Sequence, residues 1–398
     1  MSSTQESVSM PPRRSVILLV ISTIAMVSVF IISIAKDFTL STKELWSNDF
    51  QGFFLAAHLY TKGLNPYSIS NQLWAYARYV PHINGIGHVL FADAPLSLPL
   101  LHAFVDLPFR TGYLLLVAVE IIAFITGLLF AIGSIRPRAL ITCCILLGLP
   151  PVNVLILTGQ WDGIIVLGLG IHLFLMKRNR IYWSGFVLGI TACIALPHLI
   201  FGYVIYFLVR LRKPAIISVS LGFLLAGILS IMFTSTDIVT GFITSLITVQ
   251  SHAFETGFAT ILGRILPATV VDLLLAGCII AVAIYFSVKA NPEHYLPIAA
   301  CVLFLNVLLN PHFFGQDLTI PLVAVAPLME RNFHWITSHV HQYIVVGICV
   351  VGLLALITTT QYSLLPLQLV SVVVCTALCL TFGIWSTNTF HIHAVSQA

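Results

Sequence analysis

The chain has 398 residues, of which 59% are hydrophobic and only 8% are Asp, Glu, Lys or Arg. Soluble domains carry about 25% charged residues, so this composition and a mean hydropathy of +1.02 exclude a soluble globular protein. The net charge of +4 is scattered over short connections between apolar runs, which indicates membrane topology rather than a nucleic-acid partner.

Apolar runs long enough to cross a bilayer recur along the sequence. A helix needs about 20 apolar residues to span roughly 30 Å of hydrocarbon, and these runs do not alternate in polarity as barrel strands do. We therefore predict an all-α polytopic membrane protein of about 12 transmembrane helices, with residues 1–398 as a single domain. The predicted spans are 15–35, 112–133, 138–157, 161–176, 181–196, 198–210, 214–233, 268–287, 294–309, 313–329, 341–360 and 366–386.

The N-terminal run is predicted to stay attached to the protein. Arg13 and Arg14 precede it, and no small-residue cleavage site follows it, which is typical of an uncleaved signal anchor. Two long connections, residues 36–111 and 234–267, are predicted to be outer loops.

The apolar segment 95–107 is short for a span, so the distribution of basic residues decides its position. If it lies on the outer surface as a juxtamembrane helix, most of the eighteen Lys and Arg residues fall on the cytoplasmic side, as the positive-inside rule requires. The same rule makes residues 181–210 a hairpin broken at Pro197. We therefore expect a multi-pass protein of the plasma membrane with both termini in the cytoplasm.

The acidic residues show the opposite bias. With this topology, most of the fourteen Asp and Glu residues lie on the outer side or at the outer ends of spans, whereas transporters typically place ionisable groups near the bilayer midplane. Only Glu120 lies well inside a predicted span, away from its outer end. We therefore expect the polar chemistry on the outer face, with a transporter or flippase of lipid-linked sugars as the alternative.

The first outer loop opens with an acid followed by a helical pattern. Apolar residues recur there at helical spacing, at Phe50, Phe53, Phe54 and Ala57. Asn48 is a suitable N-cap and Gly63 a suitable stop, which predicts an amphipathic helix in the outer interface with Asp49 in its first turn. Asp49 either complements the helix dipole or acts as a general base toward an acceptor hydroxyl.

A second candidate group lies in the late segment LLNPHFFGQDLTIP. Asn310 and Pro311 are typical of an N-cap and a first helical residue, so His312 and Gln316 are predicted to share one helix face at the outer mouth of a span. A histidine at such a helix start either binds a phosphate or simply caps the helix.

Further candidates lie in outer turns and loops. Gln160, in LTGQWDG, is expected in a turn where its amide can bond a sugar hydroxyl, and Asp162 is expected to open the next helix. His198 lies at the tip of the predicted hairpin. Arg264 follows the second outer loop and is either an interface anchor or a phosphate ligand. Other outer cations that are candidates for phosphate binding are Lys62, Arg78 and Arg110.

The cysteines and histidines do not indicate a metal site. The eight cysteines lie inside apolar runs, where cysteine behaves as a small hydrophobe, and no disulfide framework follows from them. Histidines near the C-terminus have no acid or cysteine beside them, so no metal site is assigned. We expect no cofactor, and a divalent cation is left as an open alternative.

Three stretches carry a resemblance to a known family: DFQGFFLAAHLYTKGLNPY, FADAPLSLPLLHAFVDLP and TGQWDGIIVLGLGIHLFLMKRNR. They resemble the polytopic GT-C glycosyltransferases and are most similar to the polyprenol-phosphate-mannose-dependent mannosyltransferases of glycosyltransferase family 87. The resemblance implies an inverting transfer of a sugar, mannose in that family, from a polyprenyl phosphate. The implied acceptor is a glycolipid or glycan outside the cytoplasm, as in cell envelope glycolipid biosynthesis.

The resemblance also implies roles for single residues. The family's first-loop aspartate, the base, matches Asp49, and its outer histidine, which meets the donor phosphate, matches His312. We add His198 and Arg264 as phosphate ligands. The residues expected to contact the sugar or the acceptor are Tyr67, Asp93, Gln160 and Gln316.

Two positions depart from the family pattern. Leu196 precedes Pro197 where the family commonly has a lysine, so one expected phosphate-binding cation is missing. Asp93 stands where the family has an aromatic residue, and it either alters acceptor binding or provides a second acid. These departures leave an inactive GT-C-like scaffold as a further alternative, and the sequence leaves the oligomeric state open.

Overall fold

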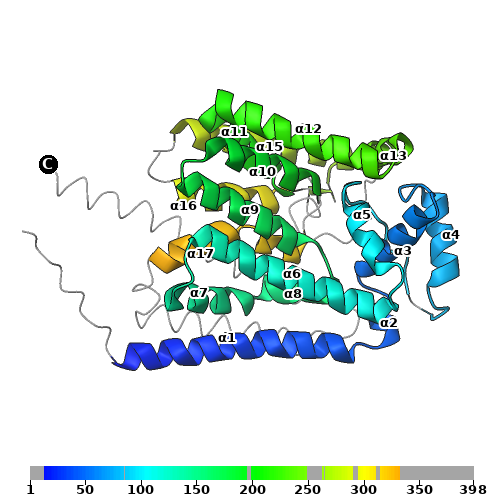
Figure 1. The fold of residues 1–398 in the computed structure, drawn as a ribbon, viewed down its shortest axis with the longest axis horizontal. Coiled ribbons are helices and arrows are strands. Elements are labelled where there is room, and N and C mark those ends of the chain that lie inside the picture. The colour runs from blue at the N-terminus through cyan, green and yellow to red at the C-terminus, as the bar shows by residue number, and fades with distance from the viewer. Residues whose placement is uncertain are drawn as a thin grey trace, which may run out of the picture.

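The computed structural model describes residues 13–84, 86–194, 199–248, 262–263, 265–289, 295–310 and 314–331. Within these ranges every regular element is a helix, as predicted. Figure 1 shows most of them side by side in a stack, with α1 (Arg13–Thr39) along one edge and α12 (Lys213–Phe233) along the opposite edge. The short helices of the first loop gather at one end of this stack.

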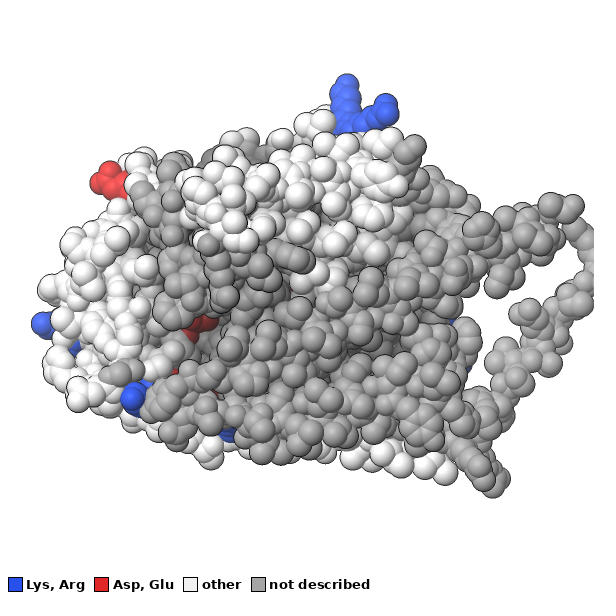
Figure 2. All heavy atoms as spheres, turned by 180° about the vertical axis from the view of Figure 1, so that it is seen from behind, with Lys and Arg blue, Asp and Glu red and all other residues white. Residues whose placement is uncertain are grey.

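Among the described residues, four helices are long and apolar enough to cross a membrane, and a bent pair of helices is a fifth candidate. The four are Val20–Thr39 within α1, α6 (Phe109–Ile132), α12, and Ala268–Val288 within α15 (Ala268–Lys289). The expectation of about 12 spans is therefore not confirmed, and the predicted spans 341–360 and 366–386 lie outside the described residues. Among the described residues visible in Figure 2, white atoms predominate and only a few Lys, Arg, Asp and Glu side chains are coloured.

The bent pair consists of α7 (Pro137–Leu147) and α8 (Pro150–Thr158), at 64° to each other. Leu149 precedes a proline, and such a residue avoids the helical region, so its backbone is extended with ψ 144°. Gly148 lets α1 approach closely at the bend, because a Cβ there would lie 2.6 Å from the Cβ of Met26. The predicted span 138–157 is thus two helices at an angle.

The other predicted spans in the described part are shorter helices. They are α9 (Asp162–Lys177), α10 (Ile181–Ile194), α11 (Phe201–Leu211) and α16 (Tyr295–Leu308). The predicted span 313–329 differs most, because it is divided into the 3-10 helix η4 (Gly315–Thr319) and α17 (Leu322–Arg331). Asp317 causes a tight turn there by accepting a hydrogen bond of 2.8 Å from the backbone N–H of Phe314.

α6 and α9 pack backbone to backbone. A Cβ at Gly127 of α6 would lie 2.5 Å from the carbonyl oxygen of Val166, and a Cβ at Gly170 of α9 would overlap the carbonyl oxygen of Gly127. Small residues permit this close approach, which supplies much of the attraction between helices in a membrane. The pairing brings the start of α9 beside the first half of α6.

The first loop is a small helical unit whose irregular part is fixed by two buried glutamines. The side chain of Gln51 donates to the carbonyl oxygen of Gly87 (3.0 Å) and accepts from the N–H of Val89 (2.8 Å). Gln72 bonds in the same way to the carbonyl oxygen (3.3 Å) and N–H (3.2 Å) of Phe91. Buried backbone groups need partners, and these side chains supply them. The elements of the unit are α2 (Thr42–Leu45), α3 (Phe50–Thr61), α4 (Ile69–Tyr79), α5 (Ser97–Leu101) and η1 (His102–Phe104).

α3 differs from the predicted interfacial helix in two ways. Nearly all of its residues are buried, because α4, α5 and η1 pack around it, so the prediction of an exposed polar face was wrong. The residue before its first helical position is Asp49 rather than Asn48, and the Asp49 side chain makes no cap bond. The predicted stop is confirmed, since Gly63 adopts a left-handed backbone with φ +67°.

The contact between α6 and α9 predicts the effect of a single methyl group. Gly170→Ala is expected to lower the free energy of unfolding by roughly 1–3 kcal/mol, because the added Cβ overlaps backbone that cannot move aside. Thermal unfolding in detergent measures this loss. Gly227→Ala in α12 is the matched control, because a Cβ there meets nothing within 4 Å. Equal melting temperatures for the two variants would contradict the close packing.

Candidate active site

The start of α3 meets the turn between α8 and α9. The backbone N–H of Asp49 donates to the carbonyl oxygen of Thr158 at 3.1 Å. The side-chain amide of Gln160 donates from Nε2 to Asp49 Oδ2 at 2.6 Å. Two candidate residues from distant parts of the sequence are therefore in direct contact, and the side-chain amide of Gln160 bonds to the carboxylate of Asp49.

The turn that presents Gln160 depends on a glycine. Gly159 ends α8 in a left-handed conformation with φ +70°. A Cβ at this position would lie 3.1 Å from the ring of Tyr113 and 3.4 Å from the Cβ of Phe50, so the turn fits closely between α6 and α3. Tyr113 is fixed in turn, because its hydroxyl donates to Asp37 Oδ1 at 2.9 Å.

Two opposing effects act on the carboxyl group of Asp49. Burial is the larger effect and raises the pKa of Asp49 above its usual value, because the charged form loses contact with water. The hydrogen bond from Gln160 lowers this pKa, because it stabilises the carboxylate. Among the described residues, Oδ1 accepts no hydrogen bond, so this oxygen is available to a ligand.

Two further acids lie near Asp49. Burial raises the pKa of Asp93 to about 7, and the negative charges of Asp49 and Asp162 add to the rise. Both Asp93 and Asp162 are buried side chains. Each negative charge in this group opposes ionisation of its neighbours, which adds to the effect of burial on the pKa of Asp93.

Tyr67 lies beside Asp93. Its hydroxyl donates to the backbone carbonyl oxygen of Asp93 at 2.5 Å, and burial raises the pKa of Tyr67 well above its usual value. The Tyr67 ring lies 5.4 Å from that of Phe91 and 5.5 Å from that of Phe242 in α13 (Thr236–Thr248). The second outer loop thus contributes a helix to this side of the site.

α9 begins at Asp162, as predicted, and its first residues carry unused polar atoms. Asp162 Oδ2 and Trp161 Nε1 are both buried and have no hydrogen-bond partner among the described residues. The Trp161 ring lies 5.3 Å from that of Phe53 in α3. A buried acceptor and a buried donor without partners are costly unless a ligand or water satisfies them, so these two atoms are candidates for contact with a ligand.

Glu120, the acid inside a predicted span, has a structural contact. Its Oε2 accepts a hydrogen bond of 2.7 Å from the backbone N–H of Gly163, in the first turn of α9. The first N–H groups of a helix have no partner within the helix, and a carboxylate there also complements the helix dipole. Glu120 therefore caps α9, a role that sequence reasoning missed because the two residues are far apart along the chain.

Gln316 is buried in η4, which packs against α8 and α9, and its Oε1 has no hydrogen-bond partner among the described residues. His312 lies outside the described residues, so the prediction that it shares one helix face with Gln316 stays a prediction. Phe314, between them, has an extended backbone (φ −123°, ψ 160°), and the helix begins only at Gly315.

The three predicted phosphate ligands, His198, Arg264 and His312, lie outside the described residues. Of the other outer cations, Arg110 donates to the carbonyl oxygens of Phe38 (2.9 Å) and Leu40 (2.5 Å) at the end of α1. The Arg110 guanidinium therefore has a structural role at the end of α1. Within the part of the chain that the structure describes, no group of three His, Cys, Asp or Glu residues has a metal-binding arrangement.

Comparison with known proteins assigns the family. The model of glycosyltransferase family 87 matches residues 91–311, which is more than half of the chain and includes Asp93, Gln160 and Asp162. No curated protein and no solved structure matches the chain. The family indicated by the three resembling stretches is thus confirmed, and the chain belongs to glycosyltransferase family 87.

Proposed function

We propose that this family 87 glycosyltransferase moves a sugar from a polyprenyl phosphate to a hydroxyl of a glycolipid or glycan acceptor. The sugar is mannose by resemblance, the reaction inverts the anomeric carbon, and the site faces outward from the plasma membrane. Family membership supports glycosyl transfer as such. The observation that supports Asp49 as the base is the 2.6 Å hydrogen bond that its Oδ2 accepts from Gln160. Oδ1 accepts no hydrogen bond from the described residues and is open to a substrate.

Asp49 is the general base in this proposal. The acceptor oxygen attacks the anomeric carbon as Asp49 Oδ1 takes its proton, and the bond to the phosphate breaks on the opposite face. The electron pair of that bond leaves with the polyprenyl phosphate, so no nucleotide is needed. Burial supports this role, because it raises the pKa of Asp49 toward the range in which a carboxylate is an effective base.

Other described residues would orient the sugar or the acceptor. Gln160 holds Asp49 charged and in place. The carboxyl of Asp93, beside Tyr67, is a further hydrogen-bond group for hydroxyls, and it serves as donor when protonated. Gln316 and Asp162 each offer an oxygen that has no partner among the described residues, as sugar hydroxyls require.

The departing phosphate needs cationic or donating groups, because negative charge develops there during the reaction. His312, His198 and Arg264 stay our candidates on the sequence argument alone. A flippase of lipid-linked sugars stays the alternative; the bond from the N–H of Gly163 to Glu120 Oε2 gives the acid of that alternative a structural contact.

Removing the base is the direct test. Asp49→Asn and Asp49→Ala are expected to lower transfer from radiolabelled polyprenyl-phosphate mannose by about 10²–10⁴-fold, since neither side chain accepts the proton. Asp106→Asn, an exposed acid of the same loop, is the matched control and should keep full activity. Full activity in either Asp49 variant would refute the assignment.

The pH dependence of transfer tests the contact with Gln160. Because this amide lowers the pKa of Asp49, Gln160→Leu should raise that pKa and move the acid limb of the pH–rate profile to higher pH. The Gln160→Leu variant should regain part of its lost transfer rate at high pH, because Asp49 is then ionised again. An unshifted acid limb with a uniformly reduced rate would mean that Gln160 acts on substrate instead.

The raised pKa of Asp93 predicts a pH-dependent stability. A carboxyl whose pKa rises from 3.8 to about 7 on folding destabilises the folded state increasingly as pH rises between these values. Asp93→Asn should therefore raise the melting temperature at pH 8 and leave it unchanged at pH 4, and the backbone bond to Tyr67 is kept. Asp106→Asn should alter neither value. A gain at pH 4 as large as at pH 8 would contradict the buried charge.

A further inference from the structure

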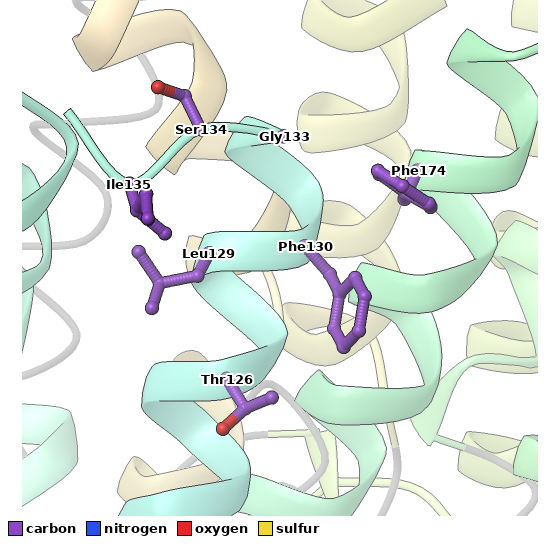
Figure 3. Close-up of a pocket in the computed structure, with 7 residues that line it drawn as sticks. All are labelled: Thr126, Leu129, Phe130, Gly133, Ser134, Ile135 and Phe174. Atoms are coloured by element: carbon purple, nitrogen blue, oxygen red, sulfur yellow. The ribbon is translucent and has the colours of Figure 1, made fainter.

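An open groove lies at the C-terminal end of α6, far from the acids. Its cavity volume is about 340 Å³. Figure 3 shows its walls: Leu129 and Ile135 lie near each other on one side, and Phe130 projects beside α9, which carries Phe174. The Phe130 and Phe174 rings meet edge to face with centroids 5.5 Å apart. Apart from Thr126 and Ser134, the side chains of the groove are apolar.

One ammonium group stands at the end of the groove. Lys177 Nζ donates to the carbonyl oxygens of Ala131 (3.0 Å) and Ile132 (2.7 Å), the last residues of α6. A Cβ at Gly133, in the groove wall, would lie 3.7 Å from this nitrogen. An ammonium has three donors, and these two carbonyls use only two of them. One charged N–H is left for a ligand.

Two guanidinium groups flank the same end. The Arg178 guanidinium lies 4.3 Å from the centroid of the Phe174 ring, so it is held directly above a groove residue. Arg136 follows Ile135 and is exposed. The nearby charges on α17 are those of Glu330 and Arg331, which both act on Lys177 and have opposite signs. The end of the groove is therefore positively charged.

The position of the groove along α6 indicates its surroundings. α6 is a candidate membrane span of 24 residues, which corresponds to a length of about 36 Å. Tyr113, beside the candidate active site, is in its first turns, whereas Gly133 follows its last residue. The groove thus lies at the level of the leaflet opposite to the candidate active site, and the apolar molecules at that level are the acyl chains of the lipids.

We propose that this groove binds an anionic phospholipid of the bilayer, with one acyl chain between Leu129, Ile135 and Phe130 and the phosphate at Lys177, Arg178 and Arg136. The apolar walls exclude water from the chain, and the cationic end selects the headgroup by charge. A zwitterionic headgroup such as phosphatidylcholine carries the same phosphate, but its quaternary ammonium is repelled by the three cations and reduces the net attraction. This site is separate from the acids, so its test is independent of the proposed transfer activity.

Lipid binding to the purified full-length protein tests the proposal. The protein is titrated with phosphatidylglycerol and, separately, with phosphatidylcholine of the same acyl chains, and bound lipid is counted by native mass spectrometry. We expect a preference for phosphatidylglycerol. Arg178→Gln and Arg136→Gln should each weaken its binding by about tenfold, the effect of one charged hydrogen bond, and should weaken phosphatidylcholine binding less, so that the preference for phosphatidylglycerol narrows. Lys213→Gln, an exposed cation at the start of α12, is the matched control.

A second variant tests the apolar part separately. Leu129→Trp fills the groove without altering charge and should abolish retention of phosphatidylglycerol while the melting temperature is kept. Equal affinity for the two lipids, or equal weakening by Lys213→Gln, would overturn the proposal. Displacement of phosphatidylglycerol by polyprenyl phosphate at a lower concentration than phosphatidylglycerol itself requires would also overturn it, because the groove would then belong to the donor lipid.

Discussion

The hydrogen bond between Gln160 and Asp49 is the contact on which the rest of the candidate site depends. It exists because Gly159 turns the chain through a left-handed conformation and because Asp49 is anchored by its own N–H to Thr158. A carboxyl group in this buried place favours its neutral form. The amide of Gln160 opposes that tendency, so a single donor influences whether the acid is available as a base.

A different set of hydrogen bonds, made by two glutamine side chains, fixes the first loop. Buried loops are uncommon because their backbone groups lack partners, yet the segment after α4 is buried against α3. Gln51 and Gln72 act there like neighbouring strands, each offering one donor and one acceptor to the passing backbone. This arrangement fixes the segment that carries Asp93. The proposed role of the loop in catalysis therefore requires no conformational change of this segment.

The sequence predicted the helices better than the contacts. α6 and α12 begin and end within a few residues of their apolar runs, because the run itself is the physical requirement for a span. The burial of α3 was not predictable, since Gln51 resembles an exposed polar residue until its partners are known. Asp49 was a candidate from the sequence alone, but its contact with Gln160 joins segments far apart in the sequence, and no local pattern reports such a pair.

The contact between Glu120 and Gly163 restricts which residues can occupy these two positions in related sequences. The carboxylate occupies the space that a side chain at position 163 would need, since a Cβ there would lie 2.6 Å from Glu120 Oε2. A Cβ at 163 would also lie 2.4 Å from the backbone carbonyl oxygen of Glu120, so position 163 requires glycine whatever side chain stands at 120. A shorter residue at 120 leaves the N–H of Gly163 without its acceptor. Among related chains, these two positions should be inherited as a pair.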